Sequence, residues 1–222
     1  MTAASLVDTA GHRRPAPGPA GEAAVLVVDT QRDFAAPERP PRSDAGARER
    51  IDAALAGTRL LVDRARAAGV PVVWTRLVQD PDEPWDSSRW LRGLADLPPE
   101  RAAAEEPCLA GTPGPEWFGA APLDGEEVVD KRRYSAFHGT DLVRMLYSAG
   151  VSWLVVCGLT TDCCVDATAR DAFQHGFRVV VAADAVGTYE QARQDAALEG
   201  LARHAAVVAT VDAVTGLWRA GG

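Results

Sequence analysis

Three side chains of the kinds used in nucleophilic catalysis stand out: the carboxylate of Asp29, the amine of Lys131 and the thiol of Cys164. Each lies at or just beyond the end of a short apolar run. Taken singly, they have ordinary explanations as a helix cap, a solvated amine and a packed thiol. A thiol with a pKa of about 8.5 becomes a better nucleophile beside a base, a cation or a helix N-terminus. Together, the three therefore offer a base, a cation and a nucleophile.

The apolar pattern predicts six strands that alternate with helices. Strands are expected at residues 24–29, 70–75, 127–130, 153–157, 177–182 and 206–211. Helices are expected at residues 47–68, 140–149, 164–175 and 189–204, followed by one short helix. This alternation is typical of an α/β fold with a parallel sheet covered on both faces. Ligands bind beyond the carboxyl ends of such strands, so Asp29, Lys131 and Cys164 are expected to meet at one edge of the sheet.

Two regions lie outside this alternation. Residues 1–22 are rich in Ala, Pro and Gly and lack periodicity, which predicts a flexible N-terminal tail before a single domain of residues 23–222. Residues 77–124 are rich in Pro and Trp. A loop of this length inside a compact domain is typically a lid or a binding loop. A packed excursion that shields the core is the alternative.

Composition and charge narrow the range of partners. The chain has 222 residues, 47% of them hydrophobic, with a formal net charge of -8 and a pI of about 5.0. This charge argues against nucleic acid and against an anionic membrane surface, and favours a small-molecule substrate. No apolar run approaches the roughly 20 residues that span a bilayer, and no signal-peptide stretch is present, so the protein is expected to be cytoplasmic. Its four cysteines lack paired CxxC spacing and are expected to be free thiols.

Three segments around the reactive residues resemble the motifs of a known family. Val27–Phe34 matches apolar-Asp-x-Gln-x-Asp-Phe, Lys131–Phe137 resembles a lysine segment, and Gly158–Val165 matches Gly-x-x-Thr-x-x-Cys-Val. Over residues 23–214, this order resembles the isochorismatase-like cysteine hydrolases, and in particular the amidohydrolase branch that includes N-carbamoylsarcosine amidase. Cys163 falls one place before the reacting thiol of the third motif and is interpreted as its neighbour.

The resemblance implies a three-layer α/β/α fold with a six-stranded, mostly parallel sheet, often assembled as a homo-dimer or homo-tetramer. It assigns Asp29 as the proton-transferring base, Lys131 as the cation and Cys164 as the nucleophile. It also implies a cis peptide bond between Leu159 and Thr160, with the N–H groups of Thr160 and Cys164 as the oxyanion hole. The implied reaction hydrolyses a non-peptide carbon–nitrogen bond in a small amide, ureido or carbamoyl compound. It proceeds through a thioester acyl-enzyme and needs no cofactor.

Departures from family patterns bear on the metal and the substrate. Nicotinamidases carry an Asp-x-His metal site after the first motif, whereas the histidines of this chain are His12, His138, His175 and His204. Residues 13–137 therefore contain no histidine, which argues against a metal and against nicotinamide as the substrate. Isochorismatases proper lack the thiol and hydrolyse a vinyl ether, so Cys164 favours an amidase. A vinyl-ether hydrolase and a non-catalytic binding subunit are the alternatives.

Five further residues are expected to bind the substrate: Gln31, Phe34, Arg76, Tyr134 and Phe137. Gln31 and Phe34 belong to the first motif. Aromatic side chains can stack on a planar substrate, and Arg76, after the second strand, can hold a carboxylate through two parallel hydrogen bonds. Core packing of the aromatic residues and a surface salt bridge of Arg76 are the alternatives.

Overall fold

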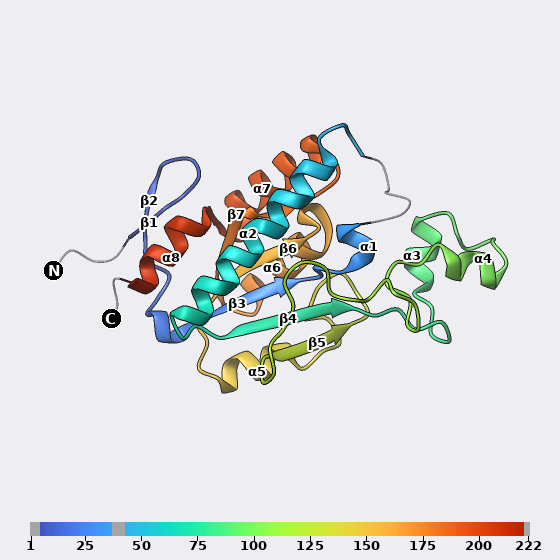
Figure 1. The fold of residues 1–222 in the computed structure, drawn as a ribbon, viewed down its shortest axis with the longest axis horizontal. Helices are drawn as coiled ribbons and strands as arrows, with labels where there is room; N and C mark the ends of the chain where they lie inside the picture. The colour runs from blue at the N-terminus through green and yellow to red at the C-terminus, as the bar shows by residue number, and fades with distance from the viewer. Residues whose placement is uncertain (1–4, 37–42, 220–222) are drawn as a thin grey trace.

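A computed structural model describes residues 5–36 and 43–219 as an α/β fold (Figure 1). Its central sheet contains six parallel strands in the order β5-β4-β3-β6-β7-β8. The strands are β3 (Ala23–Val28), β4 (Val72–Leu77), β5 (Glu127–Lys131), β6 (Trp153–Leu159), β7 (Arg178–Gly187) and β8 (Val207–Ala209). The six-stranded parallel sheet expected from the sequence is confirmed.

Helices cover both faces of this sheet and give it three layers (Figure 1). One face carries α2 (Ala47–Ala67) and α8 (Val211–Arg219), and the other carries α5 (Leu142–Ser148), α6 (Asp166–Gln174) and α7 (Gln191–His204). Successive side chains of a strand point to opposite faces. Val25 and Val27 accordingly pack on the α2 side, and Leu26 and Val28 on the α6 side. Among the described residues, no helix combines the length and apolar character of a membrane span.

The order of the strands creates a crevice at the centre of the sheet. After β3 the chain builds β4 and β5 on one side, and it then crosses to build β6, β7 and β8 on the other. Open parallel sheets bind ligands at such a switch point, beyond the carboxyl ends of the strands. Strand β6 continues to Leu159, two residues past its expected end at residue 157. This extension carries the chain directly into the crevice.

The N-terminal segment differs from the flexible tail expected over residues 1–22. In its described part, β1 (Ser5–Val7) and β2 (Arg13–Pro15) form an antiparallel hairpin, and a short helix η1 (Ala20–Glu22) follows. Leu6 is buried in the cluster under α2 and α8. The Asp8 carboxylate accepts the N–H groups of Ala10 and His12, which closes the turn. One buried side chain and local hydrogen bonds therefore order a segment that shows no periodicity in the sequence.

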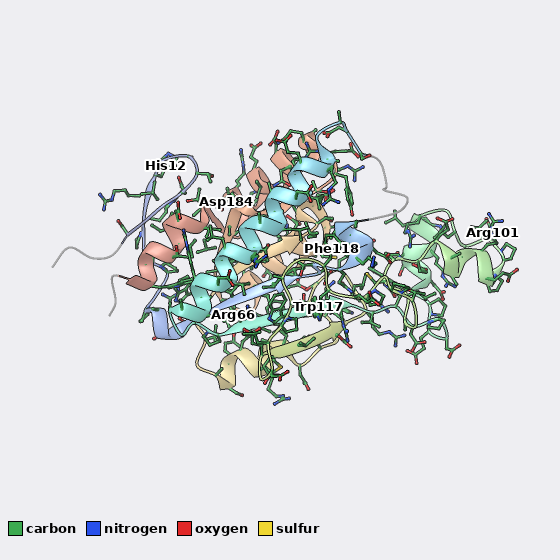
Figure 2. All side chains as sticks on the ribbon, viewed as in Figure 1. His12, Arg66, Arg101, Trp117, Phe118 and Asp184 are labelled. Carbon is green, nitrogen blue, oxygen red and sulfur yellow. The ribbon has the colours of Figure 1, made fainter. Side chains whose placement is uncertain are left out.

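The segment between β4 and β5, residues 78–126, extends beyond the carboxyl ends of the strands and then returns along the sheet to the start of β5 (Figure 1). We call it the β4–β5 segment. It contains two short helices, α3 (Asp86–Leu91) and α4 (Pro99–Ala104). Figure 2 shows Arg101 of α4 at the outer tip, far from the sheet, whereas Trp117 and Phe118 lie close to it. The segment thus reaches outward from the sheet and returns to it before β5 begins.

Candidate active site

The three reactive side chains meet beyond the carboxyl ends of β3, β5 and β6. Lys131 Nζ lies 2.7 Å from Asp29 Oδ2 and 3.5 Å from Cys164 Sγ. It also donates a hydrogen bond of 2.9 Å to the carbonyl oxygen of Arg133. A lysine ammonium carries three protons, and each has a neighbour here. The amine therefore stands between the carboxylate and the thiol, as the positions of these residues at strand ends predict.

All three side chains are withdrawn from solvent: Asp29 and Lys131 are 0% exposed, and Cys164 is 3% exposed. Burying a charge costs several kcal/mol unless an opposite charge lies beside it, so the two ions depend on each other. Burial raises the pKa of Asp29, although Lys131 opposes the shift. Burial acts to lower the pKa of Lys131, but the charges of Asp29 and Cys164 outweigh it and raise that pKa. Lys131 consequently remains a cation.

The pKa of the Cys164 thiol lies above its ordinary value. A hydrogen bond with Cys163 and burial together raise the pKa of Cys164, and the cation of Lys131 acts in the opposite direction. Asp29 and Cys164 are both neighbours of the Lys131 amine, which brings the carboxylate and the thiol to the same group. Neither Asp29 oxygen has a hydrogen bond of good geometry, despite the ion pair with Lys131. The ion pair thus holds the Asp29 carboxylate beside the Lys131 amine.

A glycine allows β3 and β6 to approach closely at this point. Gly158 pairs with Val28 and has a φ of 111°. A Cβ atom at Gly158 would lie 2.0 Å from the Val28 carbonyl oxygen, so any other residue would force the strands apart. Asp29, the next residue after Val28, therefore lies beside the turn that carries Cys164.

The turn after β6 presents the thiol at the start of a helix. The peptide bond between Leu159 and Thr160 is cis, which confirms the expectation from the resemblance. Residues 161–165 form a single π-helical turn, η2, that runs directly into α6. The carbonyl oxygen of Thr160 accepts the N–H groups of Cys163 and Val165. Single π-helical turns within helices are frequent at functional sites.

The backbone of Asp29 is itself unusual. Its φ of 49° lies in the left-handed region, which Asp occupies more readily than most residues other than glycine. The N–H group of Asp29 donates to the Thr75 carbonyl oxygen on β4, and its own carbonyl accepts the N–H group of Gln31. These bonds hold the bend at the end of β3 that carries the Asp29 carboxylate to Lys131.

The isochorismatase domain model matches residues 23–213. The chain belongs to the isochorismatase family. Maleamate amidohydrolase of Pseudomonas putida is 32% identical over 165 residues, covering 74% of this chain and 71% of that protein. Streptothricin hydrolase of Streptomyces noursei is 37% identical over 191 residues, covering 86% of this chain and 62% of that protein.

The fold has a counterpart among solved structures. A cysteine hydrolase from Pseudomonas syringae pv. phaseolicola 1448A matches with a TM-score of 0.77 and 25% identity, over 100% of both chains. Membership of the isochorismatase family, together with relatives named as amidohydrolases, assigns the protein to the hydrolases of carbon–nitrogen bonds other than peptide bonds. The resemblance drawn from the three motifs is confirmed at the level of the family.

Within this isochorismatase-family fold, Gln31 has a role other than the expected substrate contact. Its side-chain Nε2 donates to the carbonyl oxygens of Leu77 and Pro115, at 2.8 and 3.2 Å, and its Oε1 accepts the Leu77 N–H group at 2.8 Å. The residue is fully buried. The carboxamide is therefore occupied by backbone groups, and the expectation is corrected: Gln31 holds chain segments together.

Arg76 also departs from the expectation, because the pleat of β4 turns it away from the site. It shares the face that packs against α2, and its guanidinium forms two hydrogen bonds of 2.8 Å with Asp130 on β5. The same guanidinium lies 5.9 Å from the centroid of the Trp117 ring. Lys131, the next residue after Asp130, points to the opposite face. The alternative interpretation of Arg76, a salt bridge, is the one observed.

The three aromatic residues expected at the substrate site have different surroundings. Phe137 is 6% exposed and packs in the core beside Phe177, so the core alternative is observed. Phe34 is partly buried on α1 (Arg32–Ala35) and packs with Leu159, the residue before the cis bond. Tyr134 is partly buried and lines a pocket. Of the three, Phe34 and Tyr134 remain candidates for substrate contact.

That pocket has a volume of about 630 Å³ and lies between the start of the β4–β5 segment and the loop after β5. Trp85 packs edge-on against Tyr134 with a centroid distance of 4.8 Å, and the Arg133 guanidinium lies 4.8 Å above the Trp85 ring. Burial raises the pKa of Tyr134, and the nearby charges of Cys163 and Cys164 add to the effect. Tyr134 thus lines the pocket and also packs against the core cluster that includes Cys164.

Sequence reasoning included Trp85 among the aromatic residues that could line a pocket, but it did not single out Arg133, which also lines this one. Arg133 stands in the lysine segment beside Tyr134, and that position was the available signal. Nothing in the sequence pairs it with Trp85, because the two meet only through the path of the β4–β5 segment.

The histidines form no cluster in the described part of the chain. No group of three or more His, Cys, Asp or Glu side chains is placed there to hold a metal ion. His138 lines the pocket, and the ring of His175 lies 5.3 Å from that of Phe137. The expectation that the enzyme needs no metal remains a prediction.

Proposed function

We propose that this protein is a cysteine amidohydrolase that cleaves a non-peptide carbon–nitrogen bond in a small amide, ureido or carbamoyl compound. The reaction proceeds through a thioester on Cys164. The observation that carries the proposal is the position of Lys131 Nζ, 2.7 Å from Asp29 and 3.5 Å from Cys164, among side chains that are 0–3% exposed. The amidohydrolase relatives support the type of bond.

In the first half-reaction, Asp29 takes the proton of the Cys164 thiol and the sulfur attacks the carbonyl carbon. The cation of Lys131 favours this transfer because it lowers the pKa of the thiol. The carbon–nitrogen bond then breaks, and Asp29 returns its proton to the leaving nitrogen. A single carboxylate thus serves first as base and then as acid.

In the second half-reaction, water attacks the thioester. Asp29 takes a proton from this water, and the Cys164 sulfur leaves and is reprotonated. We assign the N–H groups of Thr160 and Cys164 to the developing oxyanion in both steps. Each donor in such a site contributes about 3 kcal/mol to the transition state. The exclusion of solvent strengthens these interactions, since fewer water dipoles screen them.

The substrate is small and reaches the thiol past Tyr134. Maleamate and streptothricin are the first amides to test, because the names of two relatives identify them as substrates of those enzymes. We propose that neither half-reaction needs a metal. A chelator such as EDTA should leave the rate unchanged. Loss of activity with EDTA and recovery with zinc or iron would contradict this part of the proposal.

The test of the function is a screen for ammonia release over small amides and ureido acids, with Cys164→Ala as the blank. We expect at least one compound to release ammonia in a manner that depends on Cys164. Hydrolysis of a vinyl ether with no amide turned over would support the isochorismatase alternative instead. Absence of turnover across all classes, in protein shown to be folded, would support a binding subunit.

We further propose that the enzyme is cytoplasmic and acts as a homo-dimer or homo-tetramer. All four cysteines are free thiols, in keeping with a reducing compartment. Trp90 and Leu91 of α3 are 74% and 70% exposed, and exposed apolar side chains of this size are typical of contact surfaces. Sedimentation equilibrium tests the assembly, and a monomer at micromolar concentration would contradict it.

A further inference from the structure

The opening motif binds both ends of the β4–β5 segment. The Gln31 carboxamide contacts Leu77, where the segment departs, and Pro115, where it returns. These two contacts involve a single buried side chain that lies two residues after Asp29. The same side chain therefore ties the departure and the return of the segment to the residue that we propose as the base.

Asp33, two residues further on, holds the returning chain. Its Oδ2 accepts the N–H group of Cys108 at 2.6 Å, and its own N–H group donates to the Gly114 carbonyl oxygen at 3.3 Å. A Cβ atom at Gly114 would lie 2.1 Å from Asp33 Oδ2, so the loop closes around the carboxylate at a distance that only glycine permits. Cys108 is fully buried and has a φ of 56°.

Backbone hydrogen bonds also join the departing and returning parts of the β4–β5 segment. The N–H group of Gln79 donates to the Cys108 carbonyl oxygen, and the N–H group of Ala110 donates to the backbone carbonyl oxygen of Gln79. The Phe118 N–H group donates to the Thr30 carbonyl oxygen. Figure 2 shows Phe118 near the sheet and Arg101 far from it. The base of the β4–β5 segment is thus fixed at several points, whereas its outer part with α3 and α4 extends away.

We propose that Gln31 and Asp33 are positioning residues that clamp the base of the β4–β5 segment to the chain that carries Asp29. The clamp holds the segment, and with it Trp85 of the pocket, in place relative to Asp29. The two residues act through the segment and take no part in bond making or breaking. The kinetic consequence rests on the proposed function, but the physical clamp does not depend on it.

The first test uses cysteine reactivity as the readout. Cys108 lies under the clamp, and Cys157 lies in the core on β6; both are 0% exposed. Asp33→Ala removes the acceptor of the Cys108 N–H group, whereas Asp33→Asn retains an acceptor oxygen. Asp96→Ala makes the same change at an exposed carboxylate of the segment and serves as the control. Alkylation by iodoacetamide is followed by peptide mass mapping of both cysteines.

We expect iodoacetamide to alkylate Cys108 about tenfold faster in Asp33→Ala than in the parent. The rate at Cys157 should be unchanged, because the opening is local. Asp33→Asn and Asp96→Ala should keep the parent rates. Equal acceleration at Cys108 and Cys157 would reveal global destabilisation and overturn the clamp. A parent-like rate at Cys108 in Asp33→Ala would overturn it as well.

A second variant guards against a failure of Asp33→Ala to fold. Gly114→Ala pushes the loop from Asp33 without removing a charge, and it should also accelerate alkylation of Cys108 alone. In steady-state kinetics, both variants should raise KM about tenfold with kcat within about threefold of the parent, because the catalytic groups stay in place. A loss confined to kcat would contradict the positioning role. If no amide is turned over, the proposed function fails, and the alkylation rates still decide the clamp.

Discussion

The sheet edge and the β4–β5 segment hold the site in different ways. At the sheet edge, Asp29, Lys131 and Cys164 are buried, and paired strands fix their backbone. In the β4–β5 segment the helices are short and many side chains are exposed; Trp85 packs against Tyr134 at the pocket, and Asp33 binds the base of the segment. Under the proposed function, the sheet therefore places the reacting groups, and the segment contributes part of the substrate pocket. Changes at the edge should act on kcat, and changes in the segment should act on KM.

The largest effect should come from Asp29→Asn, which removes the only proton acceptor in the proposed mechanism. An amide cannot take the thiol proton, return it to the leaving nitrogen or activate water. We expect kcat to fall on the order of 10³- to 10⁴-fold, in line with the loss of a general base. Single-turnover kinetics on folded protein measures this. A rate near that of the parent would mean that another group is the base.

Lys131→Arg keeps the charge and should cost less, about a hundredfold in kcat, because a planar guanidinium fits poorly where an ammonium sits. Thermal unfolding of the variant should match that of the parent, so that the loss reports on the site. If Lys131→Arg proves more harmful than Asp29→Asn, the roles assigned to the two residues are wrong.

Lys131→Met keeps the bulk, deletes the charge and should change the pH dependence. Lys131 lowers the pKa of Asp29, so its removal raises that pKa further. The mechanism needs ionised Asp29, and activity is therefore lost as the pH falls through this pKa. The acid limb of kcat/KM should move to higher pH in Lys131→Met and stay near the parent position in Lys131→Arg. A limb that does not move, or that moves to lower pH, would contradict the pairing.

Trp85→Ala should have a smaller effect of a different kind. The ring packs on Tyr134 and under Arg133 at the mouth of the pocket, and it does not touch the three reactive side chains. We expect KM to rise about tenfold with kcat nearly unchanged, the pattern of an interaction made equally in the bound and transition states. Leu123→Ala, at an exposed apolar side chain of the same segment, is the control. A fall in kcat with KM constant would place Trp85 in the chemistry.

The smallest effect should follow Cys163→Ala. Cys163 packs against the same core cluster as Cys164, and the ion pair of the site is formed by Asp29 and Lys131. The variant should keep most of the parent activity, whereas Cys164→Ala should lose it. Equal loss of activity in both variants, with both folded, would remove the distinction between the two thiols.

The sheet and the three reactive side chains were predictable because short-range signals carry them. Each strand is a continuous apolar run, and the motifs that contain Asp29 and Cys164 stand at strand ends. The role of Gln31 was not predictable, because its partners Leu77 and Pro115 lie 46 and 84 residues away. Arg76 was wrongly expected at the substrate site, because the face of the sheet to which it points depends on how β4 pairs with β5.

The N-terminal hairpin and the clamp show the same limit. Nothing in the composition of residues 5–22 indicates that Leu6 enters the core, since its partners come from α2 and α8. Asp33 meets Cys108 across 75 residues of sequence. Contacts of this kind depend on the path of the whole chain, and a local pattern does not contain them.

The most direct test of the cysteine mechanism is to trap the acyl-enzyme. The best amide from the screen is mixed with excess enzyme, quenched with acid within one turnover and analysed by intact mass and peptide mapping. The mechanism predicts an added acyl mass on the peptide that contains Cys163 and Cys164. The adduct should persist in Cys163→Ala and be absent, together with turnover, in Cys164→Ala. Turnover by Cys164→Ala at the parent rate, or an adduct that survives in it, would contradict the assignment of Cys164 as the nucleophile.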